Sequence, residues 1–370
     1  MIETIPTTST LSERLHERIR AEGPITFRDW MKAALYDETE GYYCRLNSNP
    51  WGREGDYRTS PERSALFAST FGRYFAGLHD KLGHPSEWII FEAGAGDGSF
   101  AEGVLKTLRD FFPDVFRATH YIIDEINSEA RTALGNRLKV FAERIEFRSL
   151  SESQINPGVV FSNELFDAFP VHRVMMSNGE LREFYVDVRQ GGNFVWKLGP
   201  ASSEHIINYF EDNEIELVEG QAAEVNLAIE DWLRQVSANM NRGYLVTVDY
   251  GLEAPDLYSA TDRMEGTLRG FKRHKHVDDL LAHPGEQDLT TTINWAFVRD
   301  VGQKLRFRTV DFERQDKFLL AAGLLTQLQS ESERAADDAE RLHLSTAARE
   351  MILPGGMATS FQVLVQETGV

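Results

Sequence analysis

The segment from Ile89 to Ser99 constrains the fold of this chain more than any other stretch. An apolar run ends in Glu92, and glycines then occupy positions 94, 96 and 98 before a helix-compatible segment begins. Glycine tolerates left-handed backbone and lets a ligand approach the main chain closely. The pattern therefore predicts a buried strand that passes through a ligand-binding turn into a helix, as in nucleotide-binding α/β folds.

The spacing of these glycines distinguishes between two cofactors. The dinucleotide fingerprint G-x-G-x-x-G would need a third glycine at position 99, where this chain has Ser99. Glu92-x-Gly94-x-Gly96-x-Gly98 is instead typical of S-adenosylmethionine (SAM) methyltransferases. The glycines would accommodate the methionine end of SAM without a Cβ clash, and Glu92 would place negative charge near its ammonium group. We expect SAM as the cofactor, and the pattern disfavours a nicotinamide dehydrogenase.

Strands and helices alternate after Trp88, which favours an α/β fold with an open, mostly parallel sheet and helices on both faces. The pattern predicts helices at 11–22, with Ser12 as a possible cap, 27–35, 62–82, 98–111, 127–138, 221–239, 297–304, 314–322 and 332–350, and strands at 88–93, 120–124, 145–148, 158–162, 243–250, 290–295, 307–311 and 361–366. Residues 172–198 are expected to form inserted β-hairpins, and 255–290 to be irregular. We divide the chain into a helical extension with a loop, 1–85, and a core, 86–370, with insertions near 172–240 and 255–290.

A second acidic position follows the strand predicted at 120–124. Asp124 and Glu125 stand at its carboxyl end, where nucleotide-binding folds use an acid to bind the ribose hydroxyls. Two carboxylate oxygens match a vicinal diol. The alternation of the strand does not decide which of the two acids binds the ribose.

The segment from Asn163 to Pro170 leaves the strand predicted at 158–162, at the sheet edge where ligands bind. Methyl transfer needs a nucleophile held about 3–3.5 Å from the methyl group. A guanidinium acceptor arrives protonated, and carboxylates can bind its fork of N–H donors. Glu164 and Asp167 suit that role, and Asn163 could position the attacking nitrogen. A plain polar turn with capping carboxylates is the alternative.

Two further polar segments have the character of functional loops, which rigid scaffolds commonly carry. One runs from Pro50 to Pro61, and the other from Gly266 to Thr290. The second contains His274, a candidate general base, although a lone histidine is more often structural. We predict no metal site, because His274 and His276 lack the partners of a known ligand pattern.

The composition narrows the class of protein and its partners. The formal net charge is −19, so binding to nucleic acid through the phosphate backbone is not expected. Cys44 is the one cysteine, which fits a reducing compartment. No apolar run approaches the ~20 residues of a membrane span, and the first ten residues resemble neither a signal peptide nor a transit peptide. We therefore expect a cytoplasmic protein without membrane insertion.

Seven ordered motifs resemble the MidA-like family of SAM-dependent methyltransferases. They are Gly-Tyr-Tyr at 41–43, Gly-Asp-Tyr-Arg-Thr-Ser-Pro at 55–61, the Glu92 to Gly98 turn, Asn-Glu-Leu-Phe-Asp-Ala at 163–168, Val-Asp-Tyr-Gly at 248–251, Gly-Thr-Leu-Arg at 266–269 with His274, and Pro-Gly at 284–285 with Asp-Leu-Thr at 288–290. The resemblance runs from about Gly23 to the C-terminus. It implies a class I methyltransferase fold, Rossmann-like, with an N-terminal helical extension and inserted elements that cap the acceptor site.

The resemblance also implies functions for particular residues. It favours Glu125 over Asp124 as the ribose acid, and it assigns Asp56, Thr59 and Ser60 to the cofactor pocket. The mitochondrial members methylate arginine during assembly of respiratory complex I. The resemblance therefore implies N-methylation of arginine in a protein substrate, of which a respiratory-complex subunit is one candidate.

Two alternatives stay open at this point. One is a methyltransferase that acts on a small-molecule oxygen or nitrogen. The other is a SAM-binding assembly factor that acts mainly through partner binding. The sequence decides neither the degree of methylation nor whether the protein is a monomer or a homodimer.

Overall fold

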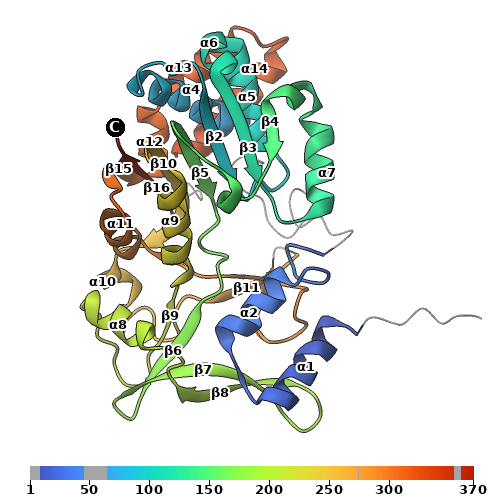
Figure 1. Ribbon diagram of the computed structural model, residues 1–370, viewed down its shortest axis with the longest axis vertical. Helices are drawn as coiled ribbons and strands as arrows, with labels where there is room; N and C mark the ends of the chain where they lie inside the picture. Colours follow the sequence, from blue (N-terminus) through green and yellow to red (C-terminus); the bar gives the residue numbers. More distant parts are fainter. Residues whose placement is uncertain (1–8, 46–64, 274, 354–359) are drawn as a thin grey trace, which may run out of the picture.

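The computed structural model describes residues 9–45, 65–273, 275–353 and 360–370. Figure 1 shows two parts, an upper part built on a large sheet and a lower part built on smaller sheets. Among the described helices, none combines the length and apolar character needed to span a bilayer.

The large sheet has the strand order β15-β16-β10-β5-β2-β3-β4, with β14 paired to β10. Its strands are β2 (Trp88–Ala93), β3 (Thr119–Asp124), β4 (Ile145–Phe147), β5 (Gly158–Asn163), β10 (Gly243–Leu252), β14 (Ile293–Asn294), β15 (Arg308–Arg314) and β16 (Phe361–Thr368). All neighbours from β4 to β10 are parallel, and β16 is antiparallel to both β10 and β15. The chain leaves β2 for β3 and β4 on one side and returns to β5 on the other. The switch point between β2 and β5 is where such folds bind ligands, at the carboxyl ends of the strands.

Helices cover both faces of this sheet (Figure 1). They are α4 (Ala65–Lys81), α5 (Ser99–Phe111), α6 (Pro113–Ala118), α7 (Ser128–Arg137), α9 (Ala228–Asn239), α10 (Ala254–Leu257), α11 (Trp295–Lys304), α12 (Gln315–Ala321), α13 (Leu324–Ser332) and α14 (Asp338–Ile352), with short 3₁₀ helices η1 (Lys139–Arg144) and η2 (Leu150–Glu152).

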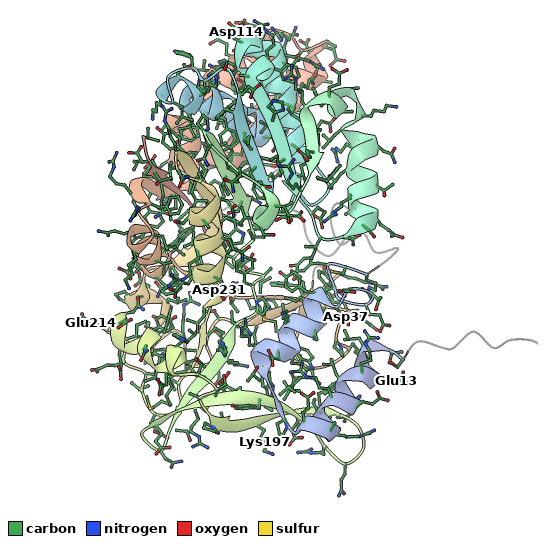
Figure 2. The ribbon with its side chains drawn as sticks, in the orientation of Figure 1. Glu13, Asp37, Asp114, Lys197, Glu214 and Asp231 are labelled. Carbon is green, nitrogen blue, oxygen red and sulfur yellow. The ribbon has the colours of Figure 1, made fainter. Side chains whose placement is uncertain are left out.

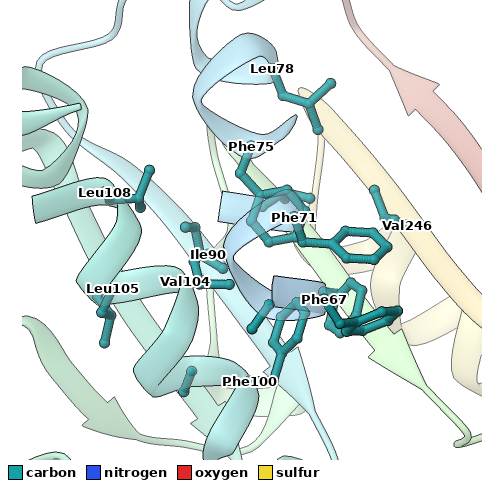
Figure 3. Packing of buried hydrophobic residues seen from close by; sticks show 14 of the residues in the cluster. Phe67, Phe71, Phe75, Leu78, Ile90, Phe100, Val104, Leu105, Leu108 and Val246 are labelled. Carbon is teal, nitrogen blue, oxygen red and sulfur yellow. The ribbon is translucent and has the colours of Figure 1, made fainter. Parts of the chain in front are cut away.

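An aromatic core holds α4 and α5 against the sheet, and Figure 3 shows part of it. Phe71 of α4 contacts the rings of Phe100 on α5 and Phe161 on β5. Phe100 and Phe161 are stacked, with ring centroids 4.0 Å apart. Rings of this size dominate the apolar area that a core buries, so this cluster fixes the start of α5 over the switch point.

The lower part is a second sheet and its helices. Its strands are β1 (Ile25–Thr26), β6 (His172–Ser177), β7 (Glu180–Val188), β8 (Phe194–Pro200) and β9 (Ala222–Val225), and its helices are α1 (Leu11–Glu22), α2 (Phe27–Tyr36) and α8 (Glu204–Asp212). A three-stranded sheet adds β11 (Arg269–Lys272), β12 (Lys275–Val277) and β13 (Asp288–Thr290). Leu15, Ile19, Trp30 and Met31 bury the apolar faces of α1 and α2 in a separate core.

The expected fold class is confirmed, and several elements differ from their predictions. The predicted helix 221–239 is wrong in its first part, because residues Ala222–Val225 pair with β6 as β9. The predicted helix 332–350 begins later, as α14 from Asp338, and α13 precedes it in a stretch, 324–331, where no helix was predicted. Thr10 rather than Ser12 caps α1, because Thr10 and Glu13 form a reciprocal capping box.

The division of the chain at residue 85 stays a prediction. Helix α4 lies within the stretch assigned to the N-terminal extension, yet it packs in the core of the large sheet. Helices α1 and α2 pack instead in the core shared with the insertion that contains β7.

Candidate active site

A cavity of about 460 Å³ lies at the carboxyl ends of β2, β3 and β5, between the two parts of the molecule. The large sheet lines one side of it through the turn after β2, the acids after β3 and the segment after β5. Helices α2 and α9 line the other side. The sequence predicted the first side, and the second is described below.

The turn after β2 adopts the conformation that its glycines permit. Gly94, Gly96 and Gly98 have φ angles of 69°, 55° and 79°, in the left-handed region. A Cβ on Gly98 would lie 2.4 Å from Leu134 Cδ2. Gly98 is also the N-cap of α5. The turn therefore needs glycine for its backbone angles and at position 98 for space as well.

Glu92 lines the cavity and is 3% exposed. The hydroxyl of Tyr121 on β3 donates a hydrogen bond to Glu92 Oε2 at 2.7 Å. Burial raises the pKa of Glu92 to about 8, although this hydrogen bond acts in the opposite direction. A buried carboxyl group of this kind will ionise readily only beside a cation, which is what an ammonium or sulfonium group would supply.

The two acids after β3 both line the cavity, with different hydrogen bonds. Asp124 Oδ2 accepts the backbone N–H of Leu150 at 2.9 Å, which anchors η2. Glu125 Oε1 accepts the backbone N–H of Asn127 at 2.9 Å. Burial raises the pKa of Glu125 to about 7. Asp124 holds a structural contact, while Glu125 is bonded within its own loop beside the cavity.

Asn163 and Glu164 line the cavity where β5 ends. Asn163 Nδ2 donates to Glu164 Oε1 at 3.1 Å, and Asn163 Oδ1 is buried without a hydrogen-bond partner among the described residues. Glu164 has a φ angle of 50°, which is uncommon for a residue with a side chain, and its N–H bonds Val248 O at 2.9 Å. Such strain is typical of functional sites. The pair thus sets a carboxylate beside a buried amide oxygen in the wall of the cavity.

Asp167 does not line the cavity, unlike its predicted partners. Its side chain is 4% exposed and accepts a hydrogen bond from the Tyr250 hydroxyl. Asp249 is fully buried nearby and accepts the N–H of Phe166 at 3.0 Å. Burial raises the pKa of both acids, and their proximity raises that of Asp249 further. The structure places Asp167 behind the wall of the cavity, next to the segment that carries Glu164.

Asp56, Thr59, Ser60 and His274 lie outside the described residues.

Within the described part of the chain, one group could offer ligands to a metal ion. His79, Asp80 and His84 place one ligand atom each within 4.8 Å of the others. They lie beyond the amino end of β2, at the opposite end of that strand from the cavity, and His79 Nε2 already bonds Pro85 O. We assign no metal to this group.

Helices α2 and α9 supply cavity residues that the sequence analysis missed. Lys32 and Tyr36 come from α2, and Asp231, Trp232 and Gln235 come from α9. No local motif marks them, since they lie on amphipathic helices that look ordinary until the fold brings them to the switch point.

Two tyrosines tie the N-terminal segment to the site. The Tyr36 hydroxyl donates to Ala168 O at 3.0 Å, and the Tyr43 hydroxyl donates to Asp288 Oδ1 at 2.7 Å. Asn127, beside Glu125, donates from Nδ2 to Tyr43 O at 3.0 Å. The last residue of α2 therefore contacts the segment after β5, and the segment that follows α2 contacts the loop after β3 and strand β13.

Comparison with known protein families identifies the family of this chain. Residues 70–312 match the family described as "Putative S-adenosyl-L-methionine-dependent methyltransferase". The match covers more than half of the chain and includes the turn after β2 and the segment after β5. The chain belongs to this family. Its cofactor is SAM, and its sheet is that of the class I methyltransferases.

A solved structure supports the same assignment. A Burkholderia thailandensis protein bound to S-adenosyl-homocysteine superposes with a TM-score of 0.85 at 26% identity, covering 99% of this chain and 96% of that one. S-adenosyl-homocysteine is the product that SAM leaves after methyl transfer.

Curated relatives carry a more specific name. A Drosophila melanogaster protein named "Protein arginine methyltransferase NDUFAF7 homolog, mitochondrial" is 28% identical over 80% of this chain and 70% of its own length. The human protein arginine methyltransferase NDUFAF7, mitochondrial, is 24% identical over 96% of this chain and 82% of its own length.

The names of these relatives correct one expectation. The sequence analysis predicted a cytoplasmic protein, and the relatives are named mitochondrial proteins. The prediction is therefore wrong. It rested on the absence of a recognisable leader, and that absence is weak evidence about location.

The residues of the cavity fit SAM. Left-handed glycine backbone leaves the turn after β2 open, and a Cβ on Gly94 would lie 3.2 Å from Leu165 Cδ1. Two buried carboxyl groups line the cavity, Glu92 at the end of β2 and Glu125 just after β3. The unpartnered Asn163 Oδ1 offers a further acceptor for an N–H donor. A cation beside Glu92 and a diol beside Glu125 would satisfy these groups.

Proposed function

We propose that this methyltransferase N-methylates an arginine side chain of a protein. The observation that carries the proposal is the Asn163–Glu164 pair, which lines the cavity with a carboxylate beside a buried amide oxygen that has no hydrogen-bond partner among the described residues. A guanidinium group offers five N–H donors in a planar fork and no acceptor. A carboxylate beside an amide oxygen complements that donor set. The names of the curated relatives point to the same acceptor.

For the cofactor, the proposal assigns Glu92 to the ammonium end, Gly94, Gly96 and Gly98 to the turn, and Glu125 to the ribose. The choice of Glu125 over Asp124 is supported by the anchoring of Asp124 to Leu150 N. Asp56, Thr59 and Ser60 remain predicted cofactor contacts, and His274 remains a predicted general base.

The chemistry follows from the charges of the side chains. SAM supplies a methyl group on a sulfonium centre. Glu164 binds the guanidinium and draws its positive charge toward the carboxylate, so that the nitrogen held by Asn163 Oδ1 keeps more of its lone pair for attack. In this proposal the Glu164 carboxylate also accepts the proton that the methylated nitrogen loses.

Asp167 acts in this proposal as a positioning residue. It accepts the Tyr250 hydroxyl, and its backbone oxygen accepts the N–H of Thr291 at 2.9 Å. These contacts hold the segment after β5 between β10, which contains Tyr250, and the residue that directly follows β13, Thr291. A more specific substrate, a subunit of a respiratory complex, is supported by the family resemblance alone.

The test uses an isosteric variant, Glu164→Gln. We expect it to lower turnover at least a hundredfold, as the loss of a charged group that acts in the transition state does, while SAM affinity stays within a few-fold of wild type. The assay transfers labelled methyl groups from SAM to a library of arginine peptides, with methylarginine identified by mass spectrometry. Calorimetry measures the SAM affinity. Glu211→Gln, an exposed glutamate on α8, removes the same charge and is the matched control.

Two results would overturn the proposal. Wild-type turnover in Glu164→Gln would remove Glu164 from the mechanism. Methylation of small amines or alcohols, with no arginine modified in any peptide or protein, would show that the acceptor is a small molecule.

A further inference from the structure

The acceptor side of the cavity carries an isolated positive charge. Among the described residues that line the cavity, Lys32 is the one cation beside six carboxylic acids, which are Glu92, Asp97, Asp124, Glu125, Glu164 and Asp231. Lys32 is exposed and forms no ion pair within 4.0 Å with any described residue. Lysines elsewhere do form such pairs, for example Lys197 with Asp187 at 3.0 Å.

The acids nearest to Lys32 in the sequence are already paired with arginines. Asp29 lies 3.3 Å from Arg18, and Asp37 lies 2.7 Å from Arg14. Arginines of α1 therefore pair with the acids at both ends of α2, and Lys32 between them lines the cavity without an ion pair to a described residue.

The position of Lys32 separates it from the cofactor half. It lies one helical turn before Tyr36, whose hydroxyl bonds Ala168 O in the segment after Glu164. Helix α2 packs in the core of the lower part, whereas the glycine turn belongs to the large sheet. Lys32 therefore stands on the acceptor side of the cavity.

Helix α9 faces the same half of the cavity with the opposite charge. Asp231 lies near the start of α9, at the end of the helix that faces the lower part in Figure 2. It lines the cavity with Trp232, whose ring packs edge-on against Phe166 at 5.2 Å between centroids. Asp231 and Lys32 form no ion pair with each other. As far as the described residues show, the acceptor side thus combines the ring of Trp232 with an anion, Asp231, and a cation, Lys32, that form no ion pair.

We propose that Lys32 binds a carboxylate of the acceptor protein, so that the arginine chosen for methylation has an acidic residue close to it. The inference rests on the proposed arginine acceptor. Asp231 attracts the guanidinium by its charge, and the face of Trp232 attracts it through a cation–π contact, before the guanidinium reaches Glu164. Lys32 then pairs with the acidic residue of the acceptor protein that lies close to the target arginine. An acceptor with a basic residue at that position would be repelled by Lys32.

The test is an array of arginine-centred peptides in which each flanking position in turn carries Asp, Asn or Lys. Wild type, Lys32→Gln and Lys106→Gln are compared by transfer of labelled methyl groups from SAM. Lys106 is exposed on α5, does not line the cavity and matches the change in net charge. We expect wild type and Lys106→Gln to prefer Asp over Asn at one or two positions by about threefold to fivefold, the range for an exposed ion pair. Lys32→Gln should lose that preference, and Lys32→Glu should favour the Lys peptides.

SAM also has a carboxylate, and a second measurement separates the two sources. Calorimetry of SAM binding should give the same affinity for wild type and Lys32→Gln. A tenfold loss of SAM affinity in Lys32→Gln would assign Lys32 to the cofactor and overturn the inference. Arginine methylation without a preference for acidic neighbours, or with a preference that Lys32→Gln retains, would also overturn it and leave the proposed function standing. An array in which wild type labels no arginine at all would count against the proposed function itself.

Discussion

Glu92→Gln should make the SAM-free protein more stable while removing its affinity for the cofactor. In the folded protein, burial raises the pKa of Glu92 to about 8 from its ordinary value of 4.5. The folded state therefore holds a proton that the unfolded state has released between these pH values, and stability falls as the pH rises through this range. Each unit of difference in pKa corresponds to about 1.4 kcal/mol. At pH 7 the carboxyl group lowers the free energy of unfolding by about 3 kcal/mol relative to a neutral group in its place.

Glutamine has nearly the same shape as glutamate and keeps an oxygen that can accept the Tyr121 hydroxyl. We therefore expect Glu92→Gln to raise the free energy of unfolding at pH 7 by about 1–3 kcal/mol, with the gain growing by about 2 kcal/mol between pH 6 and pH 8. Urea unfolding of the SAM-free protein at several pH values measures this difference. Calorimetry should show SAM binding weakened at least tenfold, because the variant lacks the carboxylate that we propose for the ammonium group of SAM.

The matched control is Glu211→Gln, which should change neither the stability nor its pH dependence by more than about 0.5 kcal/mol, as is usual for surface positions. A stability difference between wild type and Glu92→Gln that is constant from pH 6 to pH 8 would refute the argument from burial. Unchanged SAM affinity in Glu92→Gln would refute the assignment of Glu92 to the cofactor.

Two further predictions concern the loops that form the cavity. Gly98→Ala should lower the free energy of unfolding by about 1–3 kcal/mol and weaken SAM binding, because φ is +79° and the new Cβ would meet a leucine of α7. Gly135→Ala, in the last turn of α7 where a Cβ meets open space, should be neutral or stabilising by up to about 1 kcal/mol. Urea unfolding and calorimetry decide both, and equal effects at the two positions would contradict the role of the turn. Asn127→Ala removes the N-cap of α7 and the bond to Tyr43 O; we expect a loss of about 1–2 kcal/mol and faster proteolysis near Tyr43, and an unchanged cleavage rate there would show that the N-terminal segment does not depend on this contact.

The sequence predicted the half of the site that local motifs encode. Left-handed glycines, the acids after a strand and the polar segment after β5 all depend on residues that are neighbours in the chain. The order of the motifs along the chain also predicted the family and the cofactor. Asp167 shows the limit of this reasoning, because the segment 163–168 indicates polar residues near a ligand without telling which side chain points into the cavity and which points behind it.

The other half of the site depends on contacts between distant residues. Ala222–Val225 has no β-branched run before Val225 and precedes a helical pattern, so the local sequence favoured a helix from 221; pairing with β6 overrides that preference. The same long-range assembly brings α9 and α2 to the cavity. Lys32 and Trp232 could not be identified from the sequence, since amphipathic helices give no sign of which cavity their exposed residues face.

The position of β16 has a consequence for synthesis on the ribosome. Strand β16, near the end of the chain, lies between β10 and β15, and β15 pairs with no other described strand. While residues 361–368 are still inside the exit tunnel, β10 therefore has an unpaired edge and β15 has no place in the sheet. An exposed strand edge readily pairs with other chains. Completion of the sheet thus waits until β16 has followed β10 and β15 out of the ribosome, and the interval before it is when a chaperone would have most to protect.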